Sequence, residues 1–335
     1  MAQGKTSWSR NLTCPIYTKL GNNSAFCFSP DEELLFAAEG ILGPAPYSVY
    51  AAVYGSEAVE HYRRKYRLAS EINATCADKF YTPSIFEFLQ GFDVRGFTLS
   101  GFEDYALAAD ERKLPEILLD TPLGSTGDVE KQGVFNSYLG AAMFFSNTRE
   151  YVREIFALAG ELRSDRFYNT LDRYEKKIMD AQEETENHLK TMAPLEVSDL
   201  LLRKTMYRRG PYSFYTFSPT VFSRFQAARY MREEQFLFYT IRDGVYDNER
   251  TLSQLKALAD DTRFRIITLL KERGILQGSD IARAMALTPP TVSHHMKLLR
   301  EAGLVNEEAD GNTKFYSLPT DLADTVTESL RKFLN

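Results

Sequence analysis

The residues best suited to chemistry lie near the C-terminus of this 335-residue chain. Thr288-Pro289 predicts the start of a helix running to about Ala302, because proline fits the first helical turn. Its inner face would bury Val292, Met296 and Leu299. The start, the opposite face and the flanks carry small, polar or basic groups, which suit base edges and phosphates. These candidate DNA contacts are Thr288, Pro290, Thr291, Ser293, His294, Lys297 and Arg300.

The segment before this helix predicts a partner helix and a tight turn. Ser279 is expected to cap a short helix over 280–286, and Leu287 is expected to be a buried turn residue. Two short helices joined in this way form a helix-turn-helix, whose second helix enters the major groove. Gly303 is expected to end the second helix.

A β-hairpin is predicted directly after the second helix. Strand-like runs over 304–309 and 313–318 flank Asp310-Gly311-Asn312, and Asp-Gly between such runs is a strong hairpin signal. A helix-turn-helix followed by a hairpin, called the wing, makes a winged helix. Asn312 and Lys314 in the wing are therefore further candidate DNA contacts.

The distribution of charge indicates that the helix, rather than the wing, makes most of the contacts with phosphate. The whole chain has a net charge of -6 and is not a general polyanion binder. Residues 263–300 nevertheless carry seven basic and two acidic side chains. In the wing, Glu307, Glu308 and Asp310 outweigh Lys314, so we expect the helix to dominate binding.

Two earlier helices and a last helix complete the predicted module. The first would present one apolar face of Leu252, Leu255 and Leu258. Asp260 or Asp261 would cap the second, with three inward residues, Phe264, Ile267 and Leu270. The last, over 321–334, carries one apolar stripe of Leu322, Val326, Leu330 and Phe333.

Two stretches resemble the ArsR/SmtB family of winged-helix repressors. Residues 257–266, ALADDTRFRI, are similar to that family's first conserved segment. Residues 291–305, TVSHHMKLLREAGLV, are similar to its recognition helix and the start of its wing. The resemblance covers about a quarter of the chain. One departure is Pro289, where the family often has a polar side chain.

The resemblance implies a cytoplasmic homodimer that binds a double-stranded DNA operator, usually as a repressor. It implies that His295 packs under the recognition helix while His294 faces the DNA. We expect the dimer contacts to come from residues 251–259 and 321–334. In a two-fold dimer the recognition helices would meet successive major grooves, so the operator should be roughly palindromic.

Metal and cofactor sites are not expected. Metal-sensing relatives place cysteines in the third helix or histidines and carboxylates in the last one. Here the third helix has no cysteine and the last helix has no histidine. The three cysteines, Cys14, Cys27 and Cys76, form no C-x-x-C pair, which fits a reducing cytoplasm.

The first part of the chain differs in composition from the module. All but four of the aromatic residues lie in residues 1–250, so we place a boundary between domains 1–250 and 251–335. The fold class predicted is mainly α. Helix starts are indicated at Ser29 and Ser100, with a long helix from about Ser164 to Thr191. Aromatic runs within 212–246 predict a short antiparallel β pair.

The role of residues 1–250 stays open at this point. The aromatic residues could build an ordinary core or line a pocket for a small-molecule effector. The segment could also serve dimerisation, bind a partner protein, or be an enzyme regulated by the winged helix. Catalysis is not expected, because G-x-S-x-G, H-E-x-x-H and phosphate-binding glycine loops are absent from the sequence. Residues 40–56 lack charges but contain Pro44 and Pro46, and we expect buried core there and no membrane partner.

Overall fold

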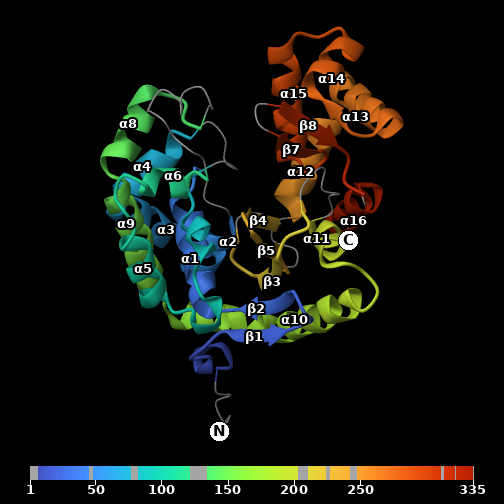
Figure 1. Cartoon of the computed structure of the whole chain (residues 1–335). Coiled ribbons are helices and arrows are strands. Elements are labelled where there is room, and N and C mark those ends of the chain that lie inside the picture. The colour runs from blue at the N-terminus through green and yellow to red at the C-terminus, as the bar shows by residue number, and fades with distance from the viewer. Residues whose placement is uncertain are drawn as a thin grey trace. The chain divides into compact units, whose positions relative to one another are not determined.

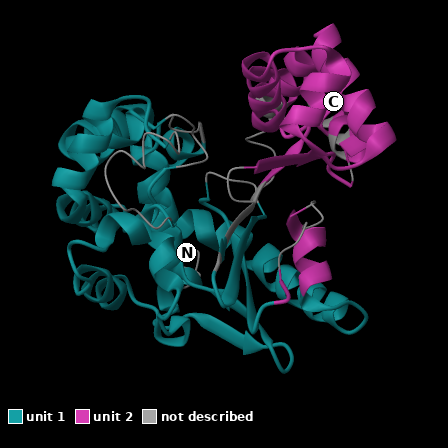
Figure 2. Cartoon of the chain, turned by 45° about the horizontal axis from the view of Figure 1, so that its top comes forward, with its two compact units in different colours: residues 1–194, 212–242 teal, residues 195–211, 243–335 magenta. Residues whose placement is uncertain are grey.

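The chain divides into two compact units in the computed structural model (Figure 2). The N-terminal unit comprises residues 1–194 and 212–242, and the C-terminal unit comprises residues 195–211 and 243–335. The structure describes residues 7–44, 48–76, 82–120, 134–202, 210–223, 227–241, 247–310, 313–320 and 322–334. The boundary predicted at residues 250 and 251 lies inside a helix of the C-terminal unit.

The N-terminal unit is mainly helical, as predicted (Figure 1). Its α-helices are α1 (Pro30–Leu42), α2 (Ser48–Tyr54), α3 (Ser56–Lys65), α4 (Arg67–Ala74), α5 (Leu99–Leu107), α6 (Leu114–Leu118), α8 (Tyr138–Ser146), α9 (Thr148–Glu161) and α10 (Asp165–Leu189). Short 3-10 turns span Ser9–Asn11, Ile85–Leu89 and Val94–Gly96. A further helix, α11 (Pro194–Leu202), begins at the junction of the two units.

Helix caps explain several of these boundaries. The Ser29 hydroxyl accepts a hydrogen bond from the Asp31 amide at the start of α1, as the sequence predicted. Ser164 accepts from the Phe167 amide at the start of α10, which also agrees with the prediction. The start predicted at Ser100 is wrong: α5 begins at Leu99, because Thr98 supplies the cap.

One five-stranded sheet crosses the N-terminal unit in the order β1-β2-β3-β5-β4. Its strands are β1 (Ile16–Lys19), β2 (Ser24–Phe28), β3 (Phe214–Thr220), β4 (Ala227–Met231) and β5 (Glu234–Thr240). The two outer pairs, β1 with β2 and β4 with β5, are antiparallel. β2 and β3 pair in parallel, as do β3 and β5.

This sheet corrects the prediction of a short antiparallel pair within 212–246. The aromatic runs do form strands, β3 and β5, but these two strands run parallel. β4 lies between them in sequence and turns back into β5, so β5 enters the sheet in the direction of β3. β2 is buried along its whole length, as expected for a strand inside a sheet.

Aromatic side chains form the core of the N-terminal unit. Phe36 of α1 stacks on Phe86 at a ring distance of 4.0 Å and meets Phe238 of β5 edge-on at 4.8 Å. Buried carboxylates tie this core together: Glu33 accepts from the amides of residues 221 and 222, and Glu39 accepts from Ser84. These aromatic residues therefore build a core, which is one of the two roles that the sequence left open.

The C-terminal unit is a helical module with a three-stranded sheet in the order β6-β8-β7. Its elements are α12 (Asp247–Leu258), α13 (Asp261–Arg273), β6 (Leu276–Gln277), α14 (Gly278–Met285), α15 (Pro289–Glu301), β7 (Asn306–Asp310), β8 (Thr313–Ser317) and α16 (Leu322–Leu334). β7 and β8 form the predicted antiparallel hairpin. This order of helices and hairpin is the predicted winged helix.

Several predicted positions in this unit are corrected. Phe264 was expected to face inward but is 56% exposed, because the buried stripe of α13 consists of Ile266, Leu269 and Leu270. Ser279 does not cap α14, which begins at Gly278 after Gln277. Exposed apolar side chains also remain on α12, at Leu252 and Leu255, so its predicted face is not covered within the chain.

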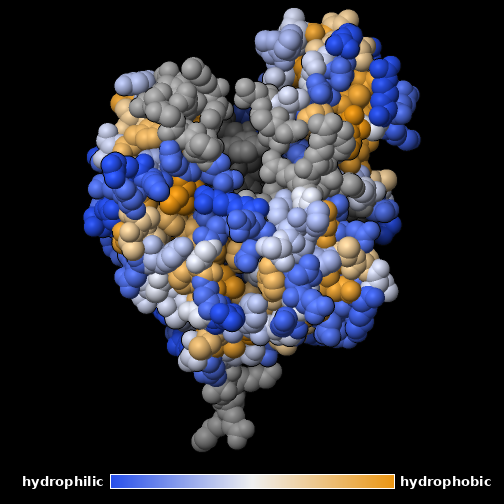
Figure 3. Space-filling view, viewed as in Figure 1, coloured by the Kyte–Doolittle hydropathy of each residue, from blue (hydrophilic) through white to orange (hydrophobic). Residues whose placement is uncertain are grey.

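Hydrophobic residues form separate patches among hydrophilic ones on the face of the molecule seen in Figure 3. Within the part of the chain that the structure describes, no helix is both long and apolar enough to cross a lipid bilayer. The uncharged stretch 40–56 contains buried residues of α1 and α2, in agreement with the prediction.

Candidate nucleic-acid interface

A tight turn places α15 against α14. Ala286 ends α14 in the left-handed conformation, with φ of 54°, and the Leu287 amide then donates to the Ala282 carbonyl. Leu287 packs against the core as a turn residue, but it is only partly buried and not buried as predicted. The Thr288 side chain accepts from the Thr291 amide and so begins α15. The predicted helix-turn-helix is confirmed.

The inner face of α15 is closed by apolar packing. Val292 is 2% exposed, and Met296 and Leu299 are fully buried in the core of the C-terminal unit. Gly303, with φ of 68°, ends the helix, and the amides of Gly303 and Leu304 donate to carbonyls of the last turn. The helix therefore has a fixed rotation, which determines the side chains that face outward.

The outer face presents most of the predicted contact residues. Thr288, Pro290, Ser293, His294 and Lys297 are exposed. Thr291 is half-buried, and its hydroxyl lies 2.8 Å from the Thr288 hydroxyl at the start of the helix. These residues form a surface of small, polar and basic groups, which we call the outer face of α15. Its chemistry matches what base edges and phosphates require.

The adjacent histidines differ in environment, as the resemblance implied. His294 is exposed, whereas the His295 side chain is 14% exposed and lies under the helix. Its Nδ1 atom is 3.9 Å from the Asp260 carboxylate, too far for a hydrogen bond. Burial lowers the pKa of His295, with smaller effects from Asp260, which raises it, and from Arg263 and His294, which lower it.

Arg300 is placed differently from the other predicted contacts. Its guanidinium lies 2.9 Å from the Glu307 carboxylate of β7, and its side chain is only 11% exposed. Lys314 of β8 reaches the same carboxylate at 3.1 Å but keeps 53% of its side chain exposed. Asn312, the remaining predicted contact, lies outside the described residues.

The wing is less acidic towards solvent than its composition suggested. Glu307 is 4% exposed and neutralised by two cations, and Glu308 is also buried. The sequence could not reveal this, because strand alternation does not tell which acidic residue meets the recognition helix. The predicted repulsion between the wing and phosphate is therefore reduced.

A hollow of about 320 Å³ lies between the recognition helix and the wing. Its lining comes from four places: the end of β6, the start of α14, the first half of α15, and β8. The residues are Gln277, Gly278, Ser279, Pro289, Val292, Ser293, Thr313, Lys314 and Tyr316. Lys314 and Ser293 thus share one concave surface, which offers a cation and a hydroxyl group.

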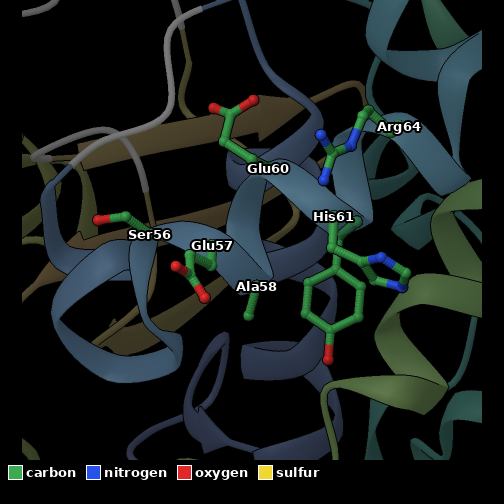
Figure 4. A pocket seen from close by; sticks show the side chains of 7 residues that line it. Ser56, Glu57, Ala58, Glu60, His61 and Arg64 are labelled. Atoms are coloured by element: carbon green, nitrogen blue, oxygen red, sulfur yellow. The ribbon is translucent and has the colours of Figure 1, made fainter.

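Other candidate sites are less developed. The described residues contain no group of three or more His, Cys, Asp and Glu side chains that could hold a metal ion. An open hollow over the N-terminal unit is lined only by residues of α3, including Glu60, His61 and Arg64 (Figure 4). Since a single helix supplies all of its lining, this hollow lacks the converging elements of a built ligand site.

Comparisons with known proteins match the C-terminal module. The profile described as "Bacterial regulatory protein, arsR family" matches residues 260–307. The transcriptional repressor SdpR of Bacillus subtilis (strain 168) is 32% identical over 80 residues, covering 24% of this chain and 88% of SdpR. The arsenical resistance operon repressor of Escherichia coli (strain K12) is 41% identical over 80 residues, covering 23% of this chain and 68% of that protein.

Among solved structures, HlyU from Vibrio cholerae N16961 is 26% identical with a TM-score of 0.22, covering 27% of this chain and 97% of HlyU. The helix-turn-helix, the hairpin and the repressors among the sequence relatives define a DNA-binding transcriptional regulator. The chain belongs, through this C-terminal module, to the ArsR family of bacterial regulatory proteins.

Proposed function

We propose that this chain is a dimeric repressor that binds operator DNA with the outer face of α15. The observation that carries the proposal is the division of α15 into two sides. Val292, Met296 and Leu299 close the inner side, while His294 and Lys297 remain exposed on the other. A helix held in this way can enter a major groove without disturbing its own core.

Two helices support the dimer in this proposal. α12 and α16 pack on each other within the chain, and the Thr251 hydroxyl donates to the Ser329 carbonyl across them. Leu252 and Leu255 of α12 stay 52% and 40% exposed. A second copy would remove this apolar surface from water and would present two recognition helices to a roughly palindromic operator.

For the N-terminal unit we propose the sensing of a small molecule or a partner, in a cytoplasmic protein that needs no metal. A separate unit with its own aromatic core can change state without unfolding the DNA-binding module. We also propose that it is not an enzyme. Burial and the neighbouring carboxylates raise the pKa of Glu32 to about 8, but Glu32 is 3% exposed and lies in the core.

The DNA-binding proposal is tested by titrating the full chain with a mixed-sequence DNA duplex at several salt concentrations. Lys297→Ala should weaken binding and reduce the slope of log affinity against log salt by about one, because one phosphate contact is lost. His294→Ala should also weaken binding. Lys271→Ala is the matched control, since this exposed lysine lies on α13 and not on α15. Unchanged affinity and slope in both α15 variants would refute the docking of this helix.

A further inference from the structure

A buried ion pair joins the end of the recognition helix to the first strand of the wing. Arg300 and Glu307 lie 2.9 Å apart, and their side chains are 11% and 4% exposed. Lys314 approaches the same carboxylate oxygen at 3.1 Å from β8. One carboxylate therefore forms an ion pair with a cation of α15 and a second ion pair with a cation of the wing.

The charge on Arg300 is compensated inside the protein. Burial raises the pKa of Glu307, but Arg300 and Lys314 outweigh burial and hold this pKa below its usual range. Glu307 is thus ionised at neutral pH and faces the guanidinium directly. A phosphate could engage Arg300 only if this buried pair separated, which would leave Glu307 buried with one fewer partner.

The strand that carries Glu307 is fixed from its other side as well. Glu307 pairs with Tyr316 in the β7–β8 ladder, and the Tyr316 hydroxyl donates to its carboxylate. Tyr316 is 4% exposed and belongs to the core of the unit. The Glu307 carboxylate is therefore held in place, and the charged ends of Arg300 and Lys314 both form ion pairs with it.

We infer that Arg300 is a positioning residue, which through Glu307 fixes the wing against α15 and sets where Lys314 meets the DNA backbone. Arg300 itself does not contact phosphate. The inference rests on the proposed DNA binding. It reverses the sequence-based assignment of Arg300 as a contact, since the exposed cations on this surface are Lys297 and Lys314.

The test uses the full chain and the same mixed-sequence duplex and salt series. Arg300→Met leaves the buried Glu307 with one fewer cation, and Glu307→Met leaves the buried Arg300 without its carboxylate, so each should weaken binding about tenfold. The double variant replaces the pair by apolar side chains of similar length. It should bind within about threefold of wild type and keep the wild-type salt slope, because the two apolar side chains still pack the wing against α15 and no phosphate contact is lost.

The sign of the Glu307→Met effect is informative by itself. If Arg300 contacted phosphate, removing the neighbouring negative charge would tighten binding. The double variant would then be as weak as Arg300→Met, with a salt slope lower by about one. Either result would overturn the inference.

Thermal unfolding of each preparation shows whether the single variants fold. If they do not fold, the salt slope of the double variant alone tests whether Arg300 contacts phosphate. Lys297→Met separates the two proposals. If wild type binds the duplex and Lys297→Met lowers the slope, a lowered slope in the double variant refutes only the role of Arg300. If wild type does not bind, the proposed function fails, and the inference fails with it.

Discussion

His294 and His295 show how far single residues could be assigned from the sequence. The rotation of α15 separates them, so one is exposed and the other lies beside Asp260. Arg300 shows the limit of the same reasoning. A helical wheel gives the direction in which a side chain leaves the helix, but a long arginine can bend towards a partner. Its partner, Glu307, lies in a strand whose facing could not be fixed beforehand.

The partly buried His295 predicts a dependence of stability on pH. Its pKa is lowered in the folded state, so the unfolded chain binds the proton more readily. The stability associated with neutral His295 is complete above the unfolded pKa of about 6.5 and declines as the pH falls below it. Lowering the pH from about 7.5 to about 5.5 should therefore destabilise wild type more than His295→Gln.

Thermal unfolding of both full-length proteins at the two pH values measures this difference. Other groups titrate equally in both proteins, so the change with pH in the stability difference between wild type and His295→Gln reports the titration of His295. A difference that stays constant, or a wild type that gains stability relative to the variant on acidification, would contradict the burial of a neutral imidazole.

At the scale of elements, some capping residues and glycines predicted helix ends correctly, whereas Ser100 and Ser279 did not. Thr288, Gly303 and the helix α10 agree with prediction. α13 was harder, because Phe264, Ile266, Ile267, Leu269 and Leu270 surround more than half of the helix. By periodicity, such a broad apolar surface is compatible with two different inner faces, and the packing of α13 against α12, α14 and α15 selects one of them.

The N-terminal cap of α13 gives a prediction at this scale. Asp260 accepts from the Arg263 amide at 2.9 Å, and this hydrogen bond is the largest cause of its lowered pKa. Asp260→Ala should reduce the free energy of unfolding by about 1 kcal/mol, whereas Asp260→Asn should retain most of it. Both variants remove the charge near His295, so their difference isolates the cap.

Chemical denaturation of the two full-length variants at one pH provides the measurement. Equal unfolding midpoints for Asp260→Ala and Asp260→Asn would mean that charge matters here and the hydrogen bond does not.

At the scale of the whole molecule, composition predicted domains 1–250 and 251–335, whereas the compact units are 1–194 with 212–242 and 195–211 with 243–335, and the central sheet was not predicted. β2 pairs with β3, although almost the whole sequence of the N-terminal unit separates the two strands; Ser24 lies opposite Tyr215. No local pattern in a sequence specifies a pairing between strands so far apart. The winged helix was easier because its elements are consecutive and its hairpin carries its own turn signal.

The proposed sensing role predicts coupling between the units. A ligand that stabilises the full chain in a thermal-shift screen should change its DNA affinity by about 1–3 kcal/mol, the usual range for coupled sites. A fragment comprising residues 243–335, which keeps α12 whole, should keep weak DNA binding and lose this response, when compared above its own dimer dissociation constant. If no stabilising ligand alters the DNA affinity of the full chain, the N-terminal unit has another role.

The central claim is that α15 reads operator DNA, and recovery of bound fragments from the native genome tests it most directly. Wild type, Lys271→Ala and the double variant His294→Ala/Lys297→Ala would each be incubated with sheared genomic DNA, and the retained fragments sequenced. We predict that wild type and Lys271→Ala retain the same few roughly palindromic sites, whereas the double variant retains none above background. Retention of the same sites by the double variant, or of none by wild type, would contradict the account.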